Sequence, residues 1–149
     1  MVPLIVLVIA LLVTRALGFA GVEAINSWPA ATRVGLAIML FFTASAHFTS
    51  MRGNLVRMVP SWVPRPETMV FFTGLCEIAG AMGLLLPKTR SAAAVALIAF
   101  LVAVFPANVH AAQAGVTLRG KPSTPLWLRA PMQLLFILLI WWSGIAAED

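Results

Sequence analysis

The residues of this sequence that could bind a ligand or move a proton lie mostly within apolar stretches. Glu77 is the one charged residue in the run FFTGLCEIAGAMGLLLP, from Phe71 to Pro87. A carboxylate in such surroundings needs a cation, hydrogen-bond donors or a proton of its own. Ionisable side chains inside membrane segments often serve function, although they can also do no more than fix how helices pack. Both roles are open for Glu77.

Other polar side chains are expected at a similar depth. A helix rises by about 1.5 Å per residue, so each position can be placed along the membrane normal. This places polar groups from four helices in one half of the bundle and predicts a pocket that opens to one membrane face and is sealed toward the other. The candidate ligand-binding residues of this pocket are His47, Thr73, Glu77, Asn108, His110, Arg129 and Gln133.

The same depths predict how Glu77 is held. Asn108 and Gln133 are expected at its level, with Arg129 supplying positive charge from nearer the membrane face. If Arg129 reaches inward, the two residues form an ion pair. If it points outward, Glu77 is expected to carry a proton.

Two classes of function fit these residue types. The first, which we favour, is a non-enzymatic protein that binds a small amphipathic or lipid-like ligand in the pocket, or assists a partner membrane protein. The second is a quinone-interacting subunit of a membrane oxidoreductase, in which the pocket binds the quinone headgroup and Glu77 relays a proton. The sequence shows no electron carrier of its own, so we predict no catalytic residue, no metal ligand and no cofactor other than a possible quinone.

The single cysteine limits redox chemistry further. One cysteine excludes an intramolecular disulfide, a CxxC redox pair and a thiolate metal cage. Because a helix interior opposes thiol reactivity, Cys76 is expected to be a small buried apolar residue.

The composition indicates which elements position these residues. The chain has 149 residues, of which 61% are hydrophobic and 10% are charged. We therefore expect an integral, multi-pass membrane protein with one helical domain over residues 1–149, located in a bacterial inner membrane. Five apolar stretches are each near the length of about 20 residues that a spanning helix needs. Their expected ranges are 2–22, 31–48, 68–86, 91–112 and 126–146.

The loops carry most of the net charge of +5. This spread of Arg and Lys fits phospholipid headgroups, whereas nucleic acid would require a basic stripe on a soluble face. Membrane lipid is thus the expected partner, and nucleic acid is not. The connection MRGNLVRMVPSWVPRPE mixes basic and apolar residues before its prolines. It is either an amphipathic anchor at the membrane interface or a lid over the pocket.

Five short motifs resemble ordered signatures of the DoxX family of small bacterial membrane proteins. The resemblance covers about residues 35–142. The motifs are SAHF (Ser45 to Phe48), MVPSWVP (Met58 to Pro64), FTGLCEIAGAMGLLLPKTR (Phe72 to Arg90), FPANVHAA (Phe105 to Ala112) and LRAPMQ (Leu128 to Gln133). The resemblance implies an all-α fold, a DoxX-like four-helix transmembrane bundle with one additional N-terminal transmembrane helix. It also implies a link to quinone or thiol redox systems, from which this chain departs by lacking a cysteine pair.

Overall fold

The computed structural model describes residues 1–118, 121–122 and 124–147. The chain is helical, with one two-residue antiparallel ladder between its last two long helices. The elements in chain order are α1 (Val2–Phe19), η1 (Glu23–Ile25), α2 (Trp28–Ser45), α3 (Arg52–Met58), α4 (Pro66–Leu85), α5 (Arg90–Gln113), β1 (Thr117–Leu118), β2 (Lys121–Pro122), α6 (Leu126–Trp141) and the π-helical turn η2 (Trp142–Ala146).

Local sequence signals explain where several helices begin. The hydroxyl oxygen of Ser27 accepts a hydrogen bond from the backbone N–H of Ala30 at 3.2 Å and caps α2. Proline occupies the first turn of α1, α2 and α4, where no backbone donor is needed. Arg65, just before α4, has a left-handed backbone with φ of 51°, which redirects the chain from the proline-rich loop into the helix.

Within the described residues, four helices are long and apolar enough to cross a membrane: α1, α4, α5 and the continuous segment Leu126–Ala146. This confirms the prediction of a helical protein with segments that can cross a membrane. The helix expected at 31–48 is not one of the four. It forms as α2, which has 18 residues and lies at the centre of the bundle with ten of them buried.

The helix α2 differs from its neighbours because it carries Arg33 into the protein interior. The Arg33 side chain is 5% exposed, and its Nη1 donates a hydrogen bond to the backbone carbonyl of Ser143 at 2.8 Å. That carbonyl belongs to η2, so the contact ties the start of α2 to the end of the last helix. A cation that would be costly in lipid is thereby satisfied inside the protein.

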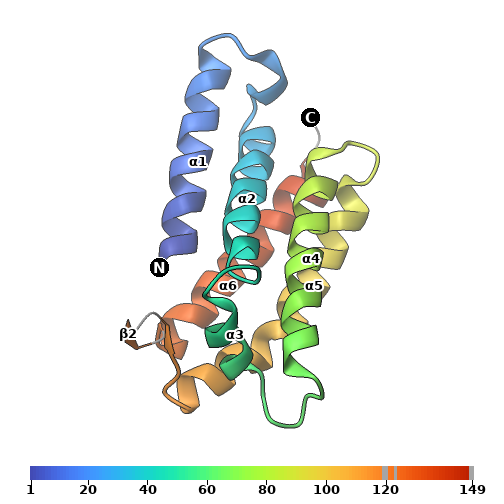
Figure 1. Cartoon of the computed structure of the whole chain (residues 1–149). Helices are drawn as coiled ribbons and strands as arrows, with labels where there is room; N and C mark the ends of the chain where they lie inside the picture. The colour runs from blue at the N-terminus through green and yellow to red at the C-terminus, as the bar shows by residue number, and fades with distance from the viewer. Residues whose placement is uncertain (119–120, 123, 148–149) are drawn as a thin grey trace.

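The core lies where α2 meets the helices around it. Leu36 and Leu40 of α2 pack in one buried cluster with Leu84 of α4, Leu97 of α5 and Ile140 of α6. In Figure 1, α1 runs antiparallel beside α2 on the side away from α4 and α5. The short helix α3 lies beyond the end of α2, beside the first half of α4. The end of α2 therefore lies beside a point partway along α4, where polar side chains of the two segments can meet.

Candidate functional site

The Glu77 side chain lies between α2 and α4 and contacts two polar neighbours. The hydroxyl of Thr43 donates to Oε2 of Glu77 at 2.6 Å, and Nε2 of His47 lies 3.5 Å from Oε1. The side chains of His47 and Glu77 are 12% and 13% exposed. Thr73, one turn before Glu77, places its hydroxyl 3.3 Å from Nδ1 of His47. We call Thr43, His47, Thr73 and Glu77 the Glu77 cluster.

The hydrogen bonds of His47 define where a proton can sit. Its Nδ1 lies 2.6 Å from the carbonyl oxygen of Val70, which can only accept, so Nδ1 carries hydrogen and donates. The second ring nitrogen, Nε2, is then the one that faces Glu77. His47 comes this close because α4 has Gly74 there; a Cβ at Gly74 would lie 2.7 Å from the Cβ of His47.

His47 lies in the turn after α2, outside the four helices that can cross a membrane. Burial lowers the pKa of His47, but its hydrogen bonds with Glu77 and the Val70 carbonyl and the charge of Glu77 raise it by more. The resulting pKa is above the ordinary value. The arrangement favours a protonated imidazole beside Glu77.

A second polar cluster joins α5 to α6. Nη1 of Arg129 donates to Oδ1 of Asn108 at 2.8 Å, and Nδ2 of Asn108 donates to Oε1 of Gln133 at 3.2 Å. Nε2 of Gln133 then donates to the carbonyl oxygen of Leu101 at 2.7 Å. We call Asn108, Arg129 and Gln133 the Asn108 cluster. Its chain of amides ends on the α5 backbone, so each member is used within the protein.

The prediction that Asn108 and Gln133 hold Glu77 beside Arg129 is wrong. Glu77 is held by Thr43 and His47, and no ion pair joins it to Arg129 within the described residues. Depth along the membrane was the basis of that prediction, but depth does not fix direction around a helix. Glu77 projects from α4 toward α2, whereas the Asn108 cluster lies between α5 and α6.

The last predicted site residue, His110, lies apart from both clusters. Its Nδ1 is 3.1 Å from the carbonyl oxygen of Met58, at the end of α3. His110 lines an open hollow of about 420 Å³ between α5 and the loop that follows α3. We call this the loop hollow. The residues that line it are Pro60, Ser61, Trp62, Phe105, Pro106, Val109, His110 and Gln113.

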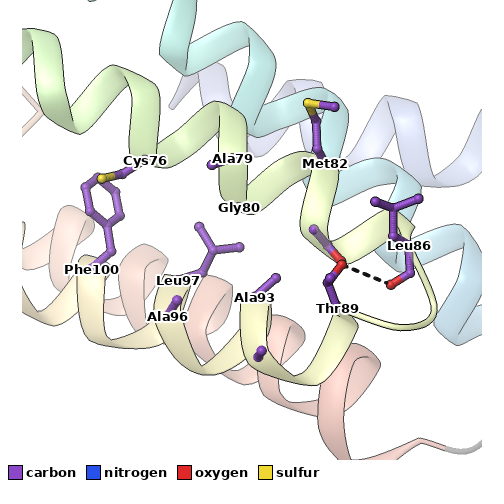
Figure 2. A pocket seen from close by; sticks show the side chains of 12 residues that line it. Cys76, Ala79, Gly80, Met82, Leu86, Thr89, Ala93, Ala96, Leu97 and Phe100 are labelled. Atoms are coloured by element: carbon purple, nitrogen blue, oxygen red, sulfur yellow. Dashed lines mark hydrogen bonds between the residues drawn. The ribbon is translucent and has the colours of Figure 1, made fainter.

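A second hollow, the α4–α5 groove, has a volume of about 550 Å³ and an almost wholly apolar lining. Figure 2 shows it running between the two helices, with Cys76 and Phe100 at one end and Leu86 and Thr89 at the other. Cys76 was expected to be buried, yet it is partly exposed and lines this groove. The sequence signal for the groove is the series of Gly and Ala residues in α4 and α5, whose small side chains leave space between the helices.

The described residues contain no group of three or more His, Cys, Asp or Glu side chains that could hold a metal ion. His47 and His110 in particular belong to different sites, since one bonds to α4 and the other to the end of α3.

Comparison with known protein families gives a match over most of the chain. The sequence model of a family described as Domain of unknown function (DUF8561) matches residues 36–144. No curated protein and no solved structure matches the chain. The resemblance to DoxX is therefore wrong: the matching family is a different one, and its range contains all five motifs on which the resemblance was based. The match begins within α2, so α1 lies outside it.

Proposed function

The chain belongs to the DUF8561 family, whose function is unknown, and we propose that it is a non-enzymatic membrane protein that binds a small amphipathic, lipid-like molecule in the loop hollow. The proposal includes a location in a bacterial inner membrane, where the basic loops face lipid headgroups. It places the ligand beside His110 and not beside Glu77.

The main support for this proposal is the order of polar and apolar residues along the loop hollow. Gln113 is the last residue of α5, and Phe105 lies eight residues earlier, about 12 Å farther into the bundle. Between them the lining changes from the polar Gln113 and His110 to Val109, Pro106 and Phe105. A ligand with a polar head and an apolar tail matches this gradient with its head at the end of the helix.

The polar groups of the hollow also indicate what the head can offer. Because Nδ1 of His110 donates to the Met58 carbonyl, Nε2 is the ring nitrogen left to bond with a ligand. Ser61 and Gln113 can each donate and accept. A hydroxyl or amide headgroup fits this set, and so does a quinone, whose carbonyls would accept from Ser61 and Gln113.

The two polar clusters support this choice of site because their hydrogen bonds are already made within the protein. The side chains of Glu77, Asn108 and Gln133 already bond to other protein groups. A ligand at either cluster would have to replace those bonds, and leaving a buried polar group unpaired costs about 1–3 kcal/mol. In this proposal the clusters hold helices together.

The loop hollow is tested by filling it. The full chain is purified in mild detergent as wild type, as Val109→Phe and as the control Val102→Phe, which enlarges an exposed α5 side chain outside both hollows. Solvent extracts are analysed by mass spectrometry, and absorbance spectra report quinone. We expect wild type and control to carry the same amphipathic compound and Val109→Phe to lose most of it. Equal amounts in all three proteins would contradict the proposal.

A further inference from the structure

We propose that the α4–α5 groove is a separate lipid site, in which one acyl chain of an anionic phospholipid lies between the helices and its phosphate lies at the α4–α5 turn. This site is independent of the loop hollow, because the two share no lining residue.

The groove exists because the two helices already touch beneath it. A Cβ at Gly80 would lie 2.3 Å from Cδ2 of Leu97, and one at Gly83 would lie 2.6 Å from the Cβ of Ala93. The helices therefore cannot approach further to close the space. On the outer side, small exposed residues such as Ala79 and Ala96 leave it unfilled (Figure 2).

The length of the groove favours an acyl chain over a helix from a second copy. Leu86, just after α4, lies ten positions beyond Cys76, which corresponds to about 15 Å along the helix. The hydrocarbon core of a bilayer is about 30 Å thick, so the groove matches one leaflet. A partner helix would gain most from a contact along the whole span, whereas an acyl chain occupies one leaflet only.

Positive charge favours an anionic headgroup at the end of the groove near Leu86. The α4–α5 turn directly follows Leu86 and contains the exposed Lys88, with Arg90 at the start of α5. The described residues 86–90 include no acid. Basic residues at a membrane surface attract anionic lipid, so a phosphate at this level would meet Lys88 while its acyl chain extends toward Cys76.

Native mass spectrometry of the full chain in detergent tests this site. The protein is titrated with phosphatidylglycerol or with zwitterionic phosphatidylcholine, and the first bound lipid is quantified. Ala96→Leu fills the groove, and Ala99→Leu is its control, since Ala99 is also exposed on α5 but does not line the groove. Lys88→Gln removes the headgroup charge. Val102→Phe, which enlarges an exposed α5 side chain outside both hollows, is expected to bind phosphatidylglycerol like wild type.

We expect wild type and Ala99→Leu to bind phosphatidylglycerol more tightly than phosphatidylcholine, and Ala96→Leu to lose this first site. Lys88→Gln should weaken phosphatidylglycerol binding by about fivefold and leave phosphatidylcholine unchanged. Unchanged binding by both Ala96→Leu and Lys88→Gln would overturn the proposal. It would equally be overturned if Ala96→Leu converted a dimer into a monomer with no change in bound lipid. If Ala96→Leu does not fold, as judged by helicity, the lipid preference of Lys88→Gln decides.

Discussion

Breaking the contact between Thr43 and Glu77 should destabilise the bundle. The free energies of unfolding lost in the two single mutants should not add in the double mutant, because both mutations remove the same contact. Thr43→Val removes the hydroxyl that donates to Glu77 Oε2 at 2.6 Å, and Glu77→Gln replaces the charged acceptor. The Thr43 hydroxyl also lies 3.0 Å from the carbonyl oxygen of Leu40, which shares its single hydrogen, but this contact is lost in both Thr43→Val backgrounds and cancels in a double-mutant cycle. The cycle therefore isolates the contact between the two side chains.

The expected size follows from the geometry. A hydrogen bond to a charged group contributes about 1.5–3 kcal/mol, while hydrogen bonds between helices of membrane proteins average about 0.6 and reach about 1.7 kcal/mol. Because the Thr43–Glu77 distance is short and both residues are largely enclosed, we expect a coupling free energy of about 1–2 kcal/mol, near the upper membrane value.

The same cycle made with Arg129→Gln in place of Thr43→Val distinguishes the observed site from the one predicted by depth. Glu77 and Arg129 share no partner within the described residues, so their effects should add to within about 0.5 kcal/mol. The assay is reversible unfolding of each variant in mixed detergent micelles, followed by circular dichroism. A coupling above about 1 kcal/mol between Glu77 and Arg129, or none between Thr43 and Glu77, would refute this description of the site.

Two other substitutions test the packing and the electrostatics of the bundle. Gly80→Ala should destabilise the protein by about 1–3 kcal/mol in the same unfolding assay, because its new Cβ would overlap the buried Leu97. Gly53→Ala, in a helix with open space around it, should be neutral or stabilising by up to about 1 kcal/mol, and equal losses at the two glycines would contradict the packing. The raised pKa of His47 stabilises the folded state fully below its unfolded pKa of about 6.5, and this contribution is lost as pH rises through the folded pKa. Wild type should therefore lose more stability than His47→Gln as the pH rises from below about 6.5 through the folded pKa of His47, and parallel pH profiles would show that His47 is not coupled to Glu77.

The family assignment shows a limit of short motifs in a membrane protein. Sequence strings that combine Gly, Ala and a few polar residues are common wherever helices pack closely in lipid. Five of them in order resembled DoxX, yet the family model that spans residues 36–144 is DUF8561. The five motifs reflect close helix packing and polar contacts between helices, which occur in many unrelated helical bundles.

The surroundings of α2 show a second limit, because its apolar run did not reveal that ten of its 18 residues are buried in the bundle. The sequence cannot tell a helix that faces lipid from one surrounded by other helices when both are apolar over a similar length. Arg33 was the available signal, because a cation near the start of an apolar helix must either reach the interface or find a buried partner. Only the fold brings the Ser143 carbonyl to within 2.8 Å of it.

The sequence by itself determined that the chain is helical and of membrane type, because apolar runs near 20 residues can satisfy their backbone in lipid only as helices. It also identified the polar residues that must find partners inside the protein. The tertiary structure alone decided the partners: Glu77 meets Thr43 and His47, while Asn108 meets Gln133 and Arg129. The reason is that spacing along a helix fixes the depth of a side chain in the bundle. The partner that the side chain meets depends on which neighbouring helix packs against it, and the tertiary packing alone decides this.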